Sequence, residues 1–594
     1  MLLANGYSLL EVALFRPDDE RITINFTRRV YSMDSVKNLL HKIYGEKTGN
    51  LALERLAPMI EKFPAAARAK KEFFSQKDVV LITYGDTLNK AGQAPIATLH
   101  EFAAKYLQDA ISTIHFLPFF PYSSDDGFSV MDFFAINPQL GSWEDVKAIG
   151  NDFGLMFDYV VNHFSSRSQW FADYLAGVPG YEDFAIAVDP ATDLSMVTRP
   201  RSLPLLSEYK KHDGNKVHLW TTFSADQIDF NFKSLDVLAK MVEVLLFYVQ
   251  NGAMILRQDA IAYLWKEIGT SCIHLAQTHD MVKLFRAILD IVAPDVMIVT
   301  ETNVPHDENI SYFGQGRDEA QMVYNFTLPP LLFYSFVNEN CKVLADWAAG
   351  LRLESPDNTF FNFTASHDGI GVRPLEGILP SQELDKLVDV VNANDGQVSY
   401  KRNPDGSDSP YELNITYVDA ILASKDSDNT SRFLAAQAIQ YALPGVPATY
   451  IHSLLGSRNW TEGVKQTGRA RSVNREQLQV DRVMADLDDP ASFRSRIFYP
   501  YLDLIKVRRA QKAFHPNADF EILEIDPKVF AIKRYCEDQT IYALTNISST
   551  ETTVSLAGTE SPGQMTDLFT AGKIDSISLT LQPYQYAWLT TEDS

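Results

Sequence analysis

Residues 235–259 read LDVLAKMVEVLLFYVQNGAMILRQD. Apolar residues recur every three or four positions in the first part of this stretch: Leu235, Leu238, Val242, Leu245 and Val249. This spacing predicts an amphipathic helix, and Gly252 marks its end. The short apolar run that follows, 254–259, is typical of a buried strand in a parallel sheet. A helix followed directly by a buried strand is the repeating unit of α/β folds.

The same alternation of short apolar runs and helical stretches extends over most of the chain from about residue 79. Eight runs are predicted as strands: 79–84, 114–119, 155–161, 254–259, 296–301, 322–326, 359–364 and 448–452. Helical stretches such as 282–292 lie between them. Eight such units predict a closed (β/α)8 barrel.

The spacing of the strands also divides the chain. The barrel is expected over 76–163 and 233–512, with a helical extension before it at 1–75. The connections after the third and seventh predicted strands, 164–232 and 366–446, are too long for simple loops and should build the rim of an active site. We predict a small antiparallel β domain over 513–594, where alternating segments are separated by turn residues.

The bulk properties limit the partners. A formal net charge of −23 at pH 7 disfavours nucleic acid and anionic membranes. No apolar run approaches the roughly 20 residues that span a bilayer, so we expect a soluble protein. The first 20 residues lack a basic region, and Asn5, Gly6 and Ser8 interrupt their apolar stretch, which predicts a cytoplasmic chain without a secretory signal. The sequence leaves a homodimer open.

Cofactor and metal motifs are missing from the sequence. The three cysteines, Cys272, Cys341 and Cys536, are far apart, which fits a reducing compartment and predicts neither a disulfide framework nor a zinc site. No glycine-rich nucleotide loop follows a predicted strand, and no other metal-ligand spacing stands out. We therefore expect no organic cofactor and no required metal.

Polar residues close four of the predicted strands, where catalytic groups of a β/α barrel lie. They are Asp158, Asn162 and His163, then Arg257 and Asp259, then Glu301, and finally His367 and Asp368. Each alone would more often be a cap, an ion-pair partner or a core histidine. Together they favour catalysis.

The spacing of these residues suggests a mechanism. Because strand side chains alternate, Arg257 and Asp259 share one side of a strand, where the guanidinium can keep the carboxylate ionised. Glu301, on the next strand, can stand about 5–5.5 Å from Asp259, the separation used in a retaining double displacement. Asp259 would then be the nucleophile, and Glu301 the general acid/base with a raised pKa.

Four of these segments, 158–163 (DYVVNH), 257–260 (RQDA), 298–301 (IVTE) and 366–368 (SHD), resemble in order and spacing the signature regions of glycoside hydrolase family 13, the α-amylase superfamily. The resemblance implies the same nucleophile and acid/base. It also implies that Asp368 is a third carboxylate that stabilises the transition state, and that His163, Arg257 and His367 line a glucose subsite.

Further segments look like the sucrose phosphorylase branch of that family: 114–122 (IHFLPFFPY), 125–128 (DDGF), 221–229 (TTFSADQID), 269–272 (GTSC) and 367–372 (HDGIGV). By the same resemblance, Asp125 and Arg471 would close the blind end of a pocket for one glucosyl unit. Arg201 and Tyr411 would bind phosphate, and a planar guanidinium suits this anion.

The acceptor is less constrained. Residues 260–279 and 410–414 look closer to glucosylglycerate phosphorylases than to sucrose phosphorylases, but both stay open. Tyr263 and the loops 199–204 and 403–412 are the candidate acceptor site. The resemblance thus implies an α-glucosyl phosphorylase whose small-molecule partners are an α-glucoside and inorganic phosphate. The alternatives are a hydrolase or nonphosphorolytic transglucosidase with the same triad, and a noncatalytic binding protein on the same barrel.

Overall fold

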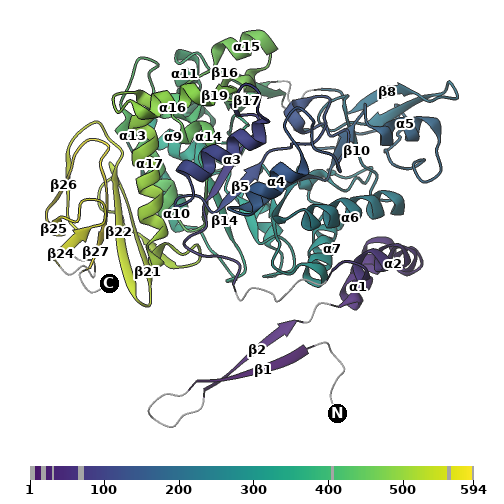
Figure 1. Cartoon of the computed structure of the whole chain (residues 1–594), viewed down its shortest axis with the longest axis horizontal. Coiled ribbons are helices and arrows are strands. Elements are labelled where there is room, and N and C mark those ends of the chain that lie inside the picture. Colours follow the sequence, from purple (N-terminus) through teal and green to yellow (C-terminus); the bar gives the residue numbers. More distant parts are fainter. Residues whose placement is uncertain are drawn as a thin grey trace.

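The computed structural model of the chain describes residues 7–14, 22–29, 32–64, 72–201, 203–402, 407–557, 559 and 563–591. Its centre is a closed barrel of parallel strands, surrounded by helices (Figure 1). The barrel strands are β3 (Val80–Thr83), β5 (Thr113–Phe116), β6 (Gly154–Val160), β11 (Ala253–Asp259), β12 (Met297–Thr300), β13 (Met322–Tyr324), β14 (Thr359–Phe363) and β18 (Val446–Tyr450). All eight predicted strands and the (β/α)8 class are confirmed.

The outer layer is formed by helices that pack around the barrel. They include α3 (Pro95–Tyr106), α4 (Trp143–Gly150), α6 (Leu235–Gln250), α7 (Ala276–Val292), α9 (Leu328–Asn338), α10 (Lys342–Ala349), α13 (Thr430–Ala442) and α17 (Phe493–Arg509). In α6, Leu238, Val242 and Leu245 are buried, as their spacing predicts. No helix among the described residues is long and apolar enough to cross a bilayer.

The first insertion follows β6. It contains β7 (His163–Ser165), α5 (Gln169–Ala176), the hairpin β8 (Leu206–Lys210) and β9 (Lys216–Trp220), and β10 (Gln227–Asp229), which pairs with β7. Val188, Val197, Leu205 and Trp220 form a small core of its own with Cys272, which belongs to the barrel loop after β11. The insertion is therefore packed onto that loop.

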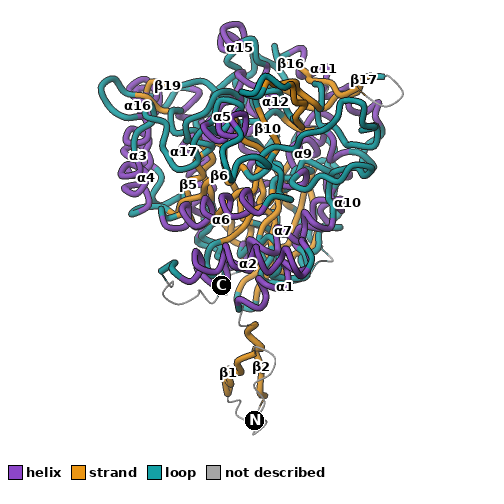
Figure 2. Tube along the Cα trace, turned by 90° about the vertical axis from the view of Figure 1, so that its right-hand side faces the viewer, coloured by secondary structure: helices purple, strands orange, loops and turns teal. Residues whose placement is uncertain are grey.

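The second insertion follows β14. A three-stranded sheet in the order β15 (Ile370–Gly371), β17 (Asp408–Asn414), β16 (Gln397–Arg402) is its main feature, together with η4 (Arg373–Leu375), α11 (Ser381–Ala393) and α12 (Tyr417–Leu422). After β18 the chain forms α14 (Ile451–Leu454), α15 (Thr461–Thr467), η5 (Ala470–Asn474), β19 (Leu478–Gln479) and α16 (Val480–Asp488). Elements of both insertions, β10, β16 and β17, lie in the upper part of Figure 2.

The C-terminal part is an antiparallel β domain, as predicted. One sheet has the order β20 (Asp519–Ile522), β21 (Val529–Cys536), β22 (Gln539–Asn546), β27 (Tyr586–Thr590), β24 (Gln564–Asp567), β25 (Lys573–Asp575). A second pair consists of β23 (Thr552–Val554) and β26 (Leu579–Leu581). Arg508 of α17 ties this domain to the barrel, because its guanidinium donates to the carbonyl oxygens of both Gly445 and Phe514.

The N-terminal segment differs from the helical extension expected over 1–75. Helices α1 (Met33–Tyr44) and α2 (Glu46–Glu61) are present, but they follow an antiparallel hairpin of β1 (Tyr7–Leu14) and β2 (Ile22–Arg29). The helical expectation is wrong for these strands because the sequence of β2 has the period of a strand: Ile22, Ile24 and Phe26 alternate with polar residues.

Candidate active site

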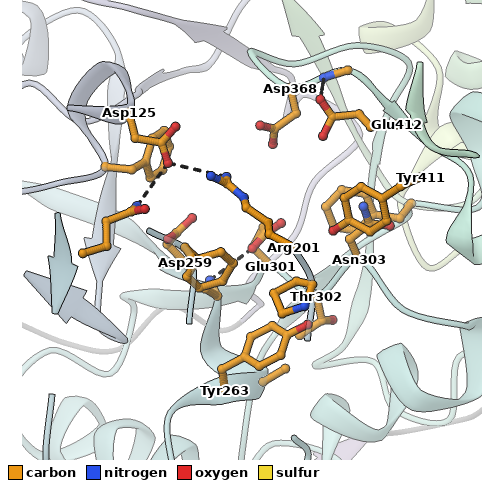
Figure 3. A pocket seen from close by; sticks show the side chains of 18 of the residues that line it. Asp125, Arg201, Asp259, Tyr263, Glu301, Thr302, Asn303, Asp368, Tyr411 and Glu412 are labelled. Carbon is orange, nitrogen blue, oxygen red and sulfur yellow. Dashed lines mark hydrogen bonds and ion pairs between the residues drawn. The ribbon is translucent and has the colours of Figure 1, made fainter. Parts of the chain in front are cut away.

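A cavity of about 840 Å³, measured with its open mouth, is lined by residues that follow the carboxyl ends of the barrel strands and by both insertions (Figure 3). Ten of the predicted site residues line it: Asp125, His163, Arg201, Asp259, Tyr263, Glu301, His367, Asp368, Tyr411 and Arg471. Arg257 is not on its wall but contacts two of these carboxylates. The structure therefore brings all the candidate residues to one place.

Arg257 is the buried centre of the site, with 2% of its surface exposed. The β6–β11 register puts it opposite Asp158, to which it donates through Nη1. Its Nη1 also lies 2.8 Å from Asp259, and its Nη2 lies 3.9 Å from Glu301. One guanidinium thus connects carboxylates from three neighbouring strands.

The carboxyl groups of Asp259 and Glu301, which both contact Arg257, differ in their surroundings. Burial raises the pKa of Glu301, Arg257 opposes this effect, and the charge of Asp368 adds to it. Burial also raises the pKa of Asp259, but Arg257 opposes it through a direct hydrogen bond, whereas the guanidinium is more than 1 Å farther from Glu301. The geometry therefore favours ionised Asp259 beside protonated Glu301.

Asp368 lies on the opposite wall, beside Arg471. The Nη1 of Arg471 is 2.6 Å from Asp368, while its Nε and Nη2 donate to both oxygens of Glu412 at 2.9 and 2.6 Å. Glu412 belongs to β17 and is 4% exposed. This bidentate contact fixes the orientation of the Arg471 guanidinium, whose Nη1 contacts Asp368.

Asp125 lies in η1 (Asp125–Gly127), a turn in which two successive non-glycine residues, Asp125 and Asp126, have φ of 54° and 49°. Such a conformation is strained and must be held by its surroundings. Asp126 is held by ion pairs with Arg469 and Arg475. Gln227 donates to Asp125 at 3.1 Å, so both the turn and its side chain are fixed.

Two histidines complete this wall as neutral groups. Burial lowers the pKa of His163 to about 4. Its Nε2 lies 2.9 Å from the carbonyl oxygen of Phe128, and because a carbonyl oxygen can only accept a hydrogen bond, Nε2 is the donor. Burial, together with Arg475, holds the pKa of His367 well below its usual range. The ring of His367 stacks on Phe128 with centroids 4.7 Å apart. Both histidines are thus placed as uncharged hydrogen-bonding groups.

Arg201 reaches into the cavity from the first insertion. Its Nη2 lies 3.6 Å from Asp125, and its guanidinium lies over the ring of Phe223, 5.5 Å from the centroid. Although burial acts in the other direction, Arg201 and Arg471 hold the pKa of Asp125 below its usual range. Tyr411, from the second insertion, also lines the cavity, and burial raises its pKa to about 12. The two insertions therefore bring a cation and a phenol to the wall of the cavity.

Residues 103–368 match the family described as α-amylase, catalytic domain. The chain is 46% identical over 94% of its length to a glucosylglycerate phosphorylase of Spirochaeta thermophila, covering 98% of that protein. It is 44% identical over 93% of its length to a glucosylglycerate phosphorylase of Escherichia coli, covering 99% of it. The chain belongs to glycoside hydrolase family 13.

Within this family the chain is a disaccharide phosphorylase. A sucrose phosphorylase of Agrobacterium vitis is 30% identical over 81% of the chain and 98% of its own length. The crystal structure of a sucrose 6F-phosphate phosphorylase from Thermoanaerobacter thermosaccharolyticum has a TM-score of 0.71 and 25% identity, over 85% of this chain and 98% of that one. The relatives named for glucosylglycerate match more of the chain than the sucrose enzyme does.

The contacts of several residues that shape this family 13 site were not predicted, although the segment 221–229 includes Phe223 and Gln227, and the candidate loop 403–412 includes Glu412. Glu412 and Gln227 hold predicted residues, and Thr302, Asn303 and Phe223 line the cavity. Glu412 stands next to Tyr411 and Thr302 next to Glu301, so adjacency to a motif was the available signal. Of the predicted acceptor loops, residues 202 and 403–406 lie outside the described residues. Within the described chain, no group of three or more His, Cys, Asp or Glu side chains could hold a metal ion.

Replacing Glu412 with Gln should loosen Arg471 and raise the KM for the glucoside by about tenfold, since a hydrogen bond to a charged group contributes ~1.5–3 kcal/mol. The melting temperature should change little, because Gln keeps the shape and one acceptor oxygen. Steady-state kinetics measure the effect, with Glu462→Gln, an exposed residue paired with Lys465, as the matched control. An unchanged KM would show that Glu412 does not position Arg471.

Proposed function

We propose that this enzyme is a retaining α-glucosyl phosphorylase that converts 2-O-α-glucosylglycerate and inorganic phosphate to α-D-glucose 1-phosphate and glycerate. The observation that carries this proposal is the pair Asp259 and Glu301, both within 4 Å of the buried Arg257 guanidinium. Two carboxyl groups beside one guanidinium, at the ends of neighbouring strands, can stand at the roughly 5 Å separation of retaining enzymes.

In the first half-reaction, an ionised oxygen of Asp259 attacks the anomeric carbon of the glucoside. The bond from this carbon to the glycosidic oxygen breaks, and Glu301 gives its proton to that oxygen, so the acceptor leaves as an alcohol. The product is a glucosyl ester on Asp259 with inverted configuration. The raised pKa of Glu301 supports its role as the acid.

In the second half-reaction, a phosphate oxygen attacks the anomeric carbon from the face opposite to Asp259. Glu301, now a carboxylate, takes the proton of that oxygen as the ester bond breaks. The second inversion restores the α configuration, and both carboxyl groups return to their starting states. The atoms of the glucoside and of phosphate are thus all accounted for.

The glucose subsite is assigned to Asp125, His163, His367, Asp368 and Arg471. The Asp368–Arg471–Glu412 contacts and the turn at Asp125 close this end of the cavity, which supports transfer of a single glucosyl unit. Asp368 would stabilise the positive charge that develops on the sugar in the transition state. The neutral histidines would hydrogen-bond to sugar hydroxyl groups.

We assign phosphate to Arg201 and Tyr411, which line the same cavity. Arg201 is 3.6 Å from Asp125, longer than a well-formed ion-pair hydrogen bond, so its donors can turn toward an anion. A local cation is needed because the chain carries a net charge of −23, which repels phosphate at long range.

Glycerate is proposed as the acceptor because relatives at 44–46% identity over 93–94% of the chain bear the name glucosylglycerate phosphorylase. Tyr263, which lines the cavity and packs edge-on against Phe223, is assigned to the acceptor side. Sucrose is the second candidate glucoside. A hydrolase would use the same triad, but it would have no use for Arg201 and Tyr411 as an anion site.

The proposed reaction predicts phosphate-dependent release of α-glucose 1-phosphate from 2-O-α-glucosylglycerate, and a slower reaction with sucrose. Initial rates of glucose 1-phosphate and free glucose release, with and without inorganic phosphate, measure both effects. A faster reaction with sucrose would replace the proposed acceptor by fructose. Free glucose as the only product, at a rate independent of phosphate, would contradict the phosphorylase.

The raised pKa of Glu301 predicts how kcat/KM for the glucoside falls at alkaline pH. The acid form is required in the first half-reaction, so kcat/KM for the glucoside should fall as pH rises through the pKa of Glu301. α-Glucosyl fluoride needs no proton on its leaving group, so its kcat/KM should not show this fall. Glu301→Gln should lower kcat/KM for the glucoside by roughly 10²–10⁴-fold and that for the fluoride far less. The same alkaline fall with both substrates would refute the assignment.

A further inference from the structure

The helices α1 and α2 precede the barrel and have no place in the proposed reaction, yet they are part of its packing. Figure 1 shows them against α6 and α7, the helices on either side of β11. Val36 and Leu40 of α1 and Leu56 and Ile60 of α2 are buried in the same hydrophobic core as the barrel. The helical pair is therefore fixed to the part of the barrel that carries Asp259.

Polar contacts fix the position of the pair. Lys42 of α1 lies 2.6 Å from Asp280, a carboxylate on α7 whose side chain is only 6% exposed. Arg55 of α2 pairs with Asp236 of α6 at the surface. A buried carboxylate needs its partner more than an exposed one does, so the Lys42 contact determines where α1 lies on α7.

Tyr44, the last residue of α1, contacts the loop that follows the nucleophile. Its hydroxyl donates to the carbonyl oxygen of Phe232 at 2.7 Å. Its ring packs edge-on against Trp265, with centroids 6.1 Å apart. Trp265 is only six residues beyond Asp259, in the loop 260–275 between β11 and α7. Tyr44 is thus a direct contact from the N-terminal helices to the active-site loop.

The loop 260–275 has two faces. Ala260, Ala262 and Tyr263 line the active-site cavity, whereas 264–268 line a second cavity of about 480 Å³, measured with its open mouth. Leu264 and Trp265 are nevertheless buried. The edge-on contact with Tyr44 is part of the packing that holds Trp265.

The same loop connects to the groups that line the active site. Lys266 donates to Asn162, the neighbour of His163, and pairs with Asp229 at 2.5 Å, all three being buried. The carbonyl oxygen of Ser271 accepts from the amide of Thr198, two residues before Pro200 on the cavity wall. A shift of the loop would therefore move Tyr263 and the backbone that carries Arg201.

We propose that the α1–α2 pair positions the acceptor side of the active site, and that Tyr44 is the positioning residue through which it acts on the loop 260–275. This proposal rests on the proposed phosphorylase function.

The proposal separates two steps of the reaction. With α-glucosyl fluoride, which needs no acid, formation of the glucosyl ester depends on Asp259, which Arg257 and the strand register hold without the loop. Transfer of the glucosyl group to phosphate or glycerate depends on Tyr263 and Arg201, which the loop holds. Disturbing Tyr44 should therefore leave the first step intact and let water compete better in the second.

The test uses the full chain with Tyr44→Ala, and with Tyr44→Phe, which keeps the ring and loses only the hydrogen bond to Phe232. With α-glucosyl fluoride as donor, fluoride release measures the first step, and the ratio of transfer to hydrolysis measures the second. Tyr44→Ala should release fluoride at the wild-type kcat/KM, while transfer to phosphate and to glycerate relative to water falls about tenfold. Tyr44→Phe should give a smaller change in the same direction.

Glu54→Gln is the matched control, since it alters the same helical pair at an exposed position. It should keep the wild-type ratio. An unchanged ratio in folded Tyr44 variants, or a parallel loss of fluoride release, would overturn the proposal. If the wild-type enzyme itself transfers no glucosyl group to phosphate, the proposed function fails instead, so the two failures are distinguishable.

Discussion

The rest of the site depends on the burial of the Arg257 guanidinium. A charge in the core of a barrel is costly unless it is paired, and removing one partner of such a pair is strongly destabilising. Asp158 and Asp259 supply the pairing at Nη1, and Glu301 lies nearby at 3.9 Å. The parallel register of β6, β11 and β12 brings these groups together, so the barrel's hydrogen bonding determines the spacing of the catalytic pair.

The electrostatic balance of the site follows from the same arrangement. More carboxyl groups than guanidinium groups surround the position where the anomeric carbon would lie, which suits a transition state with positive charge on the sugar. The proposed anionic substrates, phosphate and glycerate, would need a positive field. Arg201 would supply it from the first insertion, with Phe223 beneath its guanidinium. The barrel strands and the loops that follow them thus carry most of the carboxylates of the cavity, and the first insertion adds a cation.

The fold could be predicted from the sequence because the spacing of apolar residues shows which face of each helix or strand is buried, as in residues 235–259. The convergence of the candidate catalytic residues on one cavity could be predicted because strand ends are identifiable from the same pattern. Glu412 could not be assigned its contact, since Arg471 reaches it only when the second insertion folds over the barrel. The contact of Tyr44 with Trp265 joins residues more than 200 positions apart, and no local pattern records it. The hairpin β1–β2 was missed although Ile22, Ile24 and Phe26 alternate as a strand requires.

The central claim is that Asp259 accepts the glucosyl group while Arg257 holds it ionised. Mass spectrometry of the Glu301→Gln variant after brief reaction with α-glucosyl fluoride tests it most directly, because the variant can form the ester but lacks the base that speeds its breakdown. The account predicts a mass increase of one glucosyl unit, located by peptide mapping on Asp259. An adduct on another residue, or turnover of the fluoride without any adduct in the rapidly quenched variant, would contradict it.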